Sequence, residues 1–190
     1  VPEDDYSGRY KIVWSSETNL LYFFVEVHDD VAVDGFRSGQ TAGTFNFDMI
    51  EVFIDEDKSG GLHVFDGSGN TGRDWGTNAE NAFSYHLYAD IPADGETSPL
   101  AHVSDIDGTG WGDRIDPNYV DHVPDFVLRK DGNRYTREFS LKVYDDSYED
   151  HRVEAARVQL APGKLLGLSV AVCDNDDVNE NPAERDHFFG

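Results

Sequence analysis

Apolar and polar residues alternate with a period of two in several stretches of this chain, and this period is typical of half-buried β-strands. The clearest stretch is NLLYFFVEVH at residues 19–28, where every second residue from Leu21 to Val27 is apolar. Residues 48–55, DMIEVFID, repeat the pattern with isoleucine and valine on one face. Residues 164–173, KLLGLSVAVC, repeat it with leucine and valine. These three stretches predict the central strands of the fold.

Four further stretches have the same character but are shorter or less regular. The tripeptide from Asp131 to Asn133, with glycine at its centre, predicts a tight hairpin turn between the last two of them. Pro124 weakens the third, because proline cannot donate to a strand ladder. Trp14 ends the first stretch in phase with its apolar residues, so we expect it in the core. The four predicted strands are residues 9–14, 81–89, 122–129 and 134–144.

Helical signals are scarce along the whole sequence. Only residues 144–159 could hold a helix of one or two turns, with Asp145 or Asp146 as its N-cap. Many strands, glycine- and aspartate-rich turns and almost no helix predict an all-β fold, an antiparallel β-sandwich. A length of 190 residues fits one domain over residues 1–190. Three connections are unusually long, which is typical of functional or metal-ordered loops: residues 31–47, 60–80 and 91–119.

The charge of the chain is strongly negative. It has 38 acidic against 15 basic side chains, a formal net charge of −23. Such a surface repels phosphate backbones and anionic lipids, which argues against nucleic-acid and membrane binding. The acids could form a solvated surface, as in salt-adapted proteins, or some of them could gather around cations. Both interpretations can hold together.

Other sequence features bear on the setting of the protein. Cys173 is the single cysteine, so no internal disulfide can form, and its apolar strand predicts a buried thiol. No run of 18 apolar residues predicts a membrane span, and no signal peptide is recognisable. The sequence starts almost directly before a strand and stops without a polar tail. We therefore expect a module cut from a larger multidomain protein, with covalently linked neighbouring domains.

Carboxylates concentrate where predicted strands end. Residues 48–61, DMIEVFIDEDKSGG, run from a core strand into acids and two glycines, and a second acidic group, CDNDD, follows the last long strand. Closely spaced carboxylate oxygens on tight turns suit a hard cation such as Ca²⁺, which removes their mutual repulsion. Plain surface charge is the alternative for any one of them. The predicted calcium ligands are Asp55, Asp57, Asp48, Asp29, Asp30, Asp174 and Asp176, with Asn175 and Asp177 in the second group.

The order of these features resembles the family 9 carbohydrate-binding modules and their DOMON-like relatives. GRYKIVWSSETNLLYFFVEVHDD resembles the opening hairpin of the family, and DMIEVFIDEDKSGG its acidic strand and turn. ENAFSYHLY, YTREFSLKV and GKLLGLSVAVCDNDD resemble the later strands and the final acidic loop. The resemblance covers nearly the whole chain in the right order. It implies an antiparallel β-sandwich, structural calcium, and non-catalytic binding of sugars, often chain ends held between aromatic rings.

The resemblance also assigns candidate saccharide contacts. Phe45, in TFNFD, corresponds to the first clamping aromatic, where tryptophan is more usual. The second clamping position falls in NENPAERDHFFG, which has no tryptophan. Glu51 fits the acid that accepts hydrogen bonds from sugar hydroxyls, although an ion pair with a neighbouring Arg or Lys would explain it equally.

Two tryptophans lie in the long loops, Trp75 in GRDWG and Trp111 in GWGDR. Each could stack on the C–H-rich face of a pyranose ring, with planar polar side chains binding the hydroxyls. Each could instead cover an end of the sandwich. Tyr85, on the strand predicted at residues 81–89, is a further candidate contact. The aromatic platform has thus moved into these loops, or sugar binding has been lost.

No nucleophile elbow, phosphate-binding loop or dinucleotide fingerprint is present, so we expect no enzyme activity. The leading hypothesis is a secreted, calcium-stabilised carbohydrate-binding module, at the cell surface, outside the cell or in the periplasm. Such a module could be attached to a glycoside hydrolase or another carbohydrate-active enzyme. One alternative is a calcium-dependent structural or adhesive domain of an extracellular protein. Another is a haem-binding DOMON-like cytochrome domain, in which Met49 with His86 or Lys142 would hold the iron.

Overall fold

The computed structural model describes residues 6–33, 46–58, 83–88, 122–145, 153–177 and 185–190. Within these residues the chain forms eight strands and one short 3-10 helix, η3. The strands are β1 (Tyr6–Ser15), β2 (Leu20–Asp29), β3 (Met49–Asp55), β4 (Phe83–Tyr88), β5 (Phe126–Asp131), β6 (Arg134–Leu141), β7 (Gly167–Asp174) and β8 (His187–Phe189), and η3 spans Val153–Ala156.

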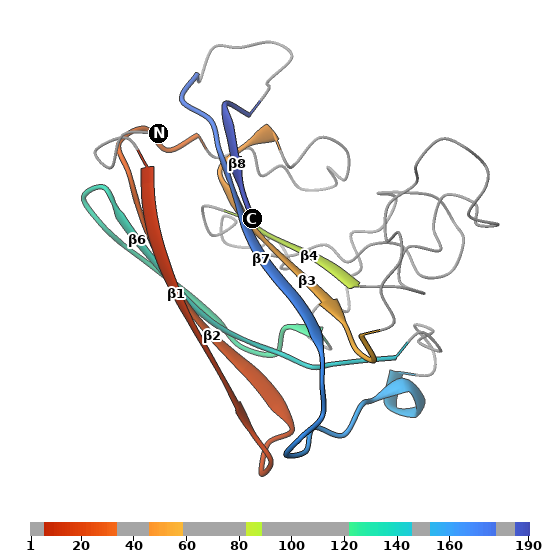
Figure 1. Ribbon diagram of the computed structural model, residues 1–190. Helices are drawn as coiled ribbons and strands as arrows, with labels where there is room; N and C mark the ends of the chain where they lie inside the picture. The colour runs from red at the N-terminus through yellow and green to blue at the C-terminus, as the bar shows by residue number, and fades with distance from the viewer. Residues whose placement is uncertain (1–5, 34–45, 59–82, 89–121, 146–152, 178–184) are drawn as a thin grey trace, which may run out of the picture.

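The strands build two sheets that face each other (Figure 1). Sheet A has the order β1-β2-β6-β5 and sheet B has the order β4-β3-β7-β8. Every neighbouring pair is antiparallel. The prediction of an all-β antiparallel sandwich is confirmed.

The core lies between the sheets and comes from alternate residues of the strands. Phe23 of β2 stacks on Phe139 of β6 with ring centroids 4.8 Å apart. Opposite them, Val52 of β3 and Leu87 of β4 have no exposed surface. Each such side chain contributes about 1.5–3 kcal/mol by leaving water, so the period-two pattern drives the sandwich to close. The inward faces predicted for residues 19–28 and 48–55 are confirmed.

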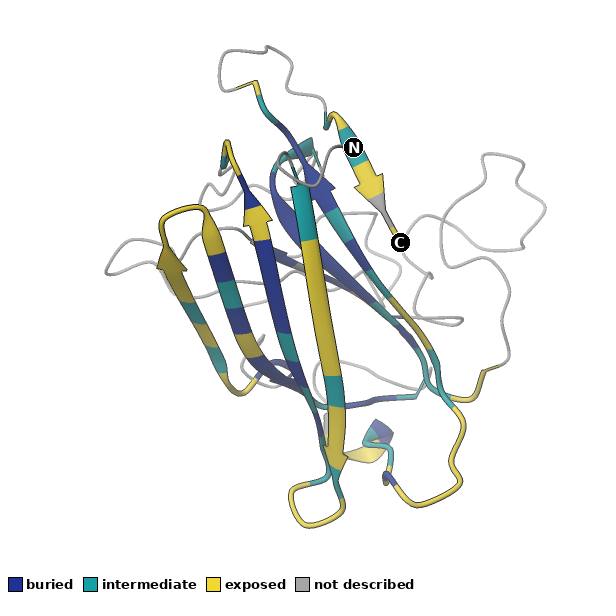
Figure 2. Cartoon of the chain, turned by 60° about the vertical axis from the view of Figure 1, so that its left-hand side comes forward, coloured by how far each residue is buried: buried dark blue, intermediate teal, exposed yellow. Residues whose placement is uncertain are grey.

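Several boundaries differ from the sequence predictions. Of the stretch at 144–159 the structure describes residues 144–145 and 153–159; these contain the single turn of η3, and Tyr144 lies in an isolated bridge with Arg157 and is itself a core residue. Trp14 is 42 % exposed and not in the core, since β1 is an edge strand (Figure 2). The three-residue strand β8 was not predicted, because two phenylalanines and a histidine are too short a pattern to recognise.

The directions of the strands determine which strand ends, with their polar side chains, lie close together. β2 and β7 both end, and β3 begins, at the same end of the sandwich. Side chains at these three positions come from both sheets and from segments far apart in the sequence. Within the described residues no helix is long and apolar enough to cross a membrane.

Candidate functional site

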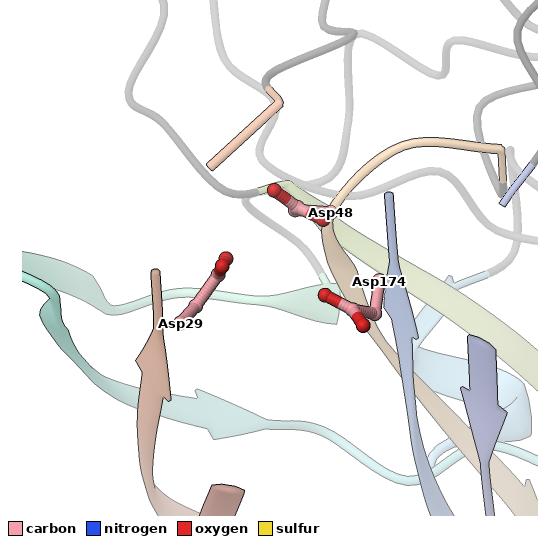
Figure 3. A group of neighbouring side chains, drawn as sticks. All are labelled: Asp29, Asp48 and Asp174. Atoms are coloured by element: carbon pink, nitrogen blue, oxygen red, sulfur yellow. The ribbon is translucent and has the colours of Figure 1, made fainter. Parts of the chain in front are cut away.

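Three buried aspartates meet at this end of the sandwich, and we call them the acid centre (Figure 3). Asp29 ends β2, Asp48 precedes β3, and Asp174 ends β7. Their exposed fractions are 4 %, 5 % and 1 %. Each offers a carboxylate oxygen within 4.8 Å of the others. A second group with the same spacing shares Asp29 and adds Asp30 and Asp176.

The electrostatics of the acid centre disfavour full ionisation. Burial raises the pKa of Asp48, and the neighbouring carboxylate of Asp29 raises it further. Burial likewise raises the pKa of Asp29, with additional repulsion from Asp174 and Asp176. Desolvation and like-charge repulsion both penalise the charged forms, and a bound cation relieves both. The arrangement of these carboxylates therefore favours the binding of a positively charged group.

A buried guanidinium supplies part of this positive charge. Arg137 of β6 is 3 % exposed, and burial lowers the pKa of its guanidinium, an effect that the charges of Tyr6, Asp48 and Asp29 partly oppose. It shares with both acids a cavity of about 10 Å³, close to the volume that holds a single water or ion. If all three carboxylates were ionised, they and the one guanidinium would sum to two negative charges, which is the charge that one divalent cation balances.

Backbone amides hold the acid centre in place. One oxygen of Asp48 accepts a hydrogen bond from the Val33 amide, and the other accepts one from the Asn175 amide at 2.8 Å. Asp29 Oδ1 accepts one from the Val31 amide at 3.0 Å. Oxygen ligands fixed in this way suit Ca²⁺, which takes six to eight oxygens in flexible geometry. Asp29, Asp48 and Asp174 could hold such an ion, with Asp30 and Asp176 beside them.

The sequence-predicted ligands are therefore divided between two places. The structure brings together Asp48, Asp174, Asp30 and Asp176, and Asp29, which the sequence also offered as a ligand, belongs to both groups. Asp55 and Asp57 lie at the opposite end of β3, about 20 Å away at the usual rise per residue. Next to them Glu56 pairs with Lys164 at 3.0 Å. The loop that follows them in sequence, from residue 59, lies outside the described residues.

Glu51 lies on the outer face of sheet B, on the side away from the core. It is 5 % exposed, and burial raises its pKa. Cys173 Sγ donates to Glu51 Oε1 at 3.5 Å, and Arg185 Nη1 lies 3.9 Å from the same oxygen. Arg185 is thus the basic neighbour that the ion-pair interpretation of Glu51 expected, although it precedes β8 and is not on an adjacent long strand.

An exposed aromatic ring adjoins this ion pair. Phe188 of β8 is 46 % exposed, and the guanidinium of Arg185 lies 4.4 Å from its ring centroid. Because Phe188 pairs with Cys173, which pairs with Met49, these side chains share the outer face of sheet B. We call Glu51, Arg185 and Phe188 the edge group. It combines an acid, a planar cation and a ring, the components that bind sugar hydroxyls and C–H faces.

The candidate Tyr85 requires a correction. Its side chain is 1 % exposed and belongs to the core between the sheets. Its hydroxyl lies 3.1 Å from Nδ1 of His122, which has no exposed surface. β4 turns Tyr85 inward together with Phe83 and Leu87, so Tyr85 cannot stack on a surface saccharide.

Trp75, Trp111 and Phe45 lie outside the described residues. Their roles in saccharide binding stay predictions from the sequence.

Two residues of these sites escaped the sequence analysis. Arg137 sits among Tyr135, Phe139 and Leu141 on the inward face of β6. An arginine at a core position requires a buried counter-charge, and that signal was present in the sequence. Arg185 carried no comparable signal, because its neighbours come from β3 and β7, which are remote in sequence.

A model of the family described as carbohydrate family 9 binding domain-like matches residues 1–186 of the chain. Solved structures of a family 9 carbohydrate-binding module from Caldicellulosiruptor kristjanssonii have the same fold. The complex with glucose gives a TM-score of 0.54 at 14 % identity, covering 96 % of this chain and 65 % of that one. The complex with cellotriose gives 0.55 at 14 % identity, covering 96 % and 64 %.

This chain thus spans slightly less than two thirds of the length of those two structures. No curated protein sequence matches it. The similarity to the solved structures shows the fold, while the family model matches nearly every residue in order. On that match, and with the two-sheet architecture that accompanies it, the chain belongs to the carbohydrate family 9 binding domain-like family.

Proposed function

We propose that this protein is a non-catalytic carbohydrate-binding module that binds saccharide on the outer face of sheet B. The observation that carries the proposal is the edge group. Arg185 is held between Glu51 and the exposed ring of Phe188, with 3.9 Å to the acid and 4.4 Å to the ring centroid. Membership of the family supports the ligand class.

Each member of the edge group would have a separate task. Phe188 is the most exposed of the three and would lie against a pyranose face. Arg185 would donate to ring hydroxyls in its plane. Glu51 is nearly buried, so it would mainly orient Arg185 and accept one hydroxyl at most. Phe45, Trp75 and Trp111 remain candidates for further stacking contacts on the same ligand.

We propose in addition that Ca²⁺ binds the acid centre and stabilises the fold. The ion would join β2 of sheet A to the ends of β3 and β7 in sheet B, and so hold one end of the sandwich closed. Its chemistry there is structural, since it neutralises buried carboxylates that the fold has brought together. The ion would not contact the saccharide through the edge group, which belongs to a different set of side chains.

The experiment for the saccharide site is calorimetric titration of cellotriose, the sugar bound by one related structure, into wild type and Phe188→Ala. We expect about 5- to 150-fold weaker binding in the variant, if a sugar stacked on the ring contributes about as much as a stacked nucleobase, about 1–3 kcal/mol. The matched control is Leu165→Ala, which is 67 % exposed and lies outside the edge group. Equal affinity of the two variants would refute this site, and a glycan array with and without chelator would then identify other ligands.

A calcium-dependent structural or adhesive domain is the second candidate, and the acid centre alone supports it. In that case the protein would bind nothing on a glycan array yet lose stability on chelation. For either function we propose an extracellular or cell-surface setting, because millimolar calcium there would keep even a weak site filled, and we propose covalent linkage to neighbouring domains.

A further inference from the structure

A second surface of the molecule has the character of a ligand site, on the outer face of sheet A. A shallow hollow of about 550 Å³ lies there, with all four strands of the sheet contributing to it. Neither the acid centre nor the edge group takes part in it. Four strands span about 14 Å at the usual spacing, which is long enough for a short oligosaccharide.

The floor of the hollow is aromatic where a solvent-facing sheet should be polar. β2 carries its core residues on one face, yet Tyr22 and Phe24 occupy the opposite face and are half-buried. On either side, Val13 of β1 is 63 % exposed and Val127 of β5 is 44 % exposed. The register places Phe24 between Lys11 and Glu138, so the apolar floor runs across the sheet with polar groups beside it.

The charges in the hollow are balanced, in contrast to the rest of the chain. Arg9, Lys11, Asp125 and Glu138 line it, two cations and two acids, in a protein of net charge −23. Ion pairs hold two of these side chains in place: Arg9 pairs with Glu26 at 2.8 Å, and Glu138 pairs with Arg129 at 2.7 Å. A neutral ligand is not repelled here, whereas an anionic polymer would meet the field of the surrounding acids.

The same features select a glycan over a protein. Eleven described residues line the hollow, against about 20–30 on each side of a stable protein interface. A protein would also have to desolvate the exposed ion pairs, which costs more than it returns unless every hydrogen bond is replaced. A narrow polyol leaves the outer side of each pair in water and adds hydroxyl hydrogen bonds to its planar groups. A second copy of this chain would bring another 23 negative charges.

We propose that the hollow on sheet A is a second saccharide-binding site, which takes a neutral glycan chain across Tyr22 and Phe24. The inference rests on the proposed carbohydrate-binding function, but it assigns a surface separate from the edge group. Two sites on opposite sheets would let one module contact two glycan chains, or one chain twice, and so raise retention on an insoluble polymer beyond either affinity.

The test uses the full chain with cellohexaose in solution and amorphous cellulose as the insoluble polymer. We expect two ligands per protein, with amide shifts in β1, β2 and β6 that persist in Phe188→Ala. The double variant Val13→Asp/Val127→Asp changes only exposed rim positions on edge strands, so it should keep the wild-type melting temperature. Its retention on amorphous cellulose should fall at least tenfold, while the control Leu165→Asp, outside the hollow, should match wild type.

Phe24→Ala provides a second probe, because it removes the floor and should abolish the sheet A shifts alone. One ligand per protein with shifts confined to sheet B would overturn the inference and leave the proposed function standing. Absence of any cellohexaose binding would remove both. A dimer in sedimentation that the double variant dissociates would show that a second copy occupies the hollow, and would also overturn the inference.

Discussion

The acid centre and His122 are both buried ionisable sites, and they differ in whether the buried groups are held charged or neutral. Asp174 is 1 % exposed and His122 has no exposed surface. His122 lies among aromatic side chains, with its ring centroid 4.7 Å from that of Tyr144 and its Nδ1 3.1 Å from the Tyr85 hydroxyl. Burial lowers the pKa of His122 to about 3, with a further contribution from Lys142 and Arg157.

His122 therefore avoids the desolvation cost of a buried charge by staying neutral, and the hydroxyl of Tyr85 lies within hydrogen-bond distance of one ring nitrogen. The acid centre cannot do so equally well, because several carboxylates compete for the same small volume and backbone amides bind their ionised oxygens. An ionisable group in the core is thus no sign of function by itself. An excess of one sign of charge, held by donors that favour the charged form, is the feature that points to a cation.

Removal of calcium tests this contrast with the largest expected effect. An ion present at about 1,000 times its dissociation constant stabilises the folded state by about 4 kcal/mol. For a chain of this size that corresponds to a melting temperature about 10 °C higher. Thermal unfolding with added calcium and with a calcium chelator measures the difference. Magnesium serves as the control, since it prefers a small octahedral site and should restore little.

An identical melting temperature in both solutions would mean that Arg137 and proton uptake neutralise the acid centre without a metal. That outcome would leave the proposed saccharide site at the edge group untouched, because none of the proposed ligands of the ion belongs to it.

Asp29→Asn should have a smaller effect on stability, with opposite signs in the presence and absence of calcium. The amide can still accept from the Val31 amide through its oxygen, and its nitrogen can donate towards Asp48. One negative charge is lost, so we expect calcium affinity about 100-fold weaker, or about 2.7 kcal/mol. Without calcium the same variant should be more stable than wild type, because it removes repulsion from the acid centre. Calorimetric calcium titration and chelator-treated unfolding give the two numbers.

Asp57→Asn is the matched control, since Asp57 is an exposed acid beyond the far end of β3. Its effect on stability should stay within about 0.5 kcal/mol in either solution. A calcium affinity that falls in Asp57→Asn and not in Asp29→Asn would move the ion to the turn that the sequence first suggested.

The strands were predictable because their evidence is local. Each core strand shows its alternation within eight to ten residues, and the hairpin turn shows its glycine, at φ +60° in the structure. The prediction that Trp14 lies in the core was wrong for a reason that is not local, because the pattern of β1 does not reveal that the strand lies at a sheet edge. The prediction that Tyr85 contacts a saccharide was wrong because both faces of its strand carry aromatic or polar residues, so the sequence does not show which face is buried.

The acid centre was predictable in part. Acids at strand ends mark candidate ligands, but only the strand polarity shows that Asp48, and not Asp55, meets Asp174. The sequence placed Arg137 at a core position without showing which carboxylates lie beside it, and the edge residue Arg185 needed the pairing of strands that are remote in sequence. Composition could show the surplus of acid, and only the topology shows where that surplus is buried.

The neutral state of His122 predicts the smallest effect, a pH dependence with a definite sign. Its pKa is about 3 when folded and about 6.5 when unfolded, so below pH 6.5 the unfolded chain binds a proton that the folded chain excludes. Stability from this group is complete above pH 6.5 and is lost as pH falls, by about 1.4 kcal/mol at pH 5.5.

Urea unfolding at pH 7.5 and 5.5, with saturating calcium to keep the acid centre constant, measures the loss. His122→Gln should be less stable at both values but lose about 1.4 kcal/mol less between them. The control His28→Gln alters a histidine whose side chain is 53 % exposed and should lose as much as wild type. Equal losses in all three proteins would show that His122 is not held neutral, and the contrast with the acid centre would then rest on the carboxylates alone.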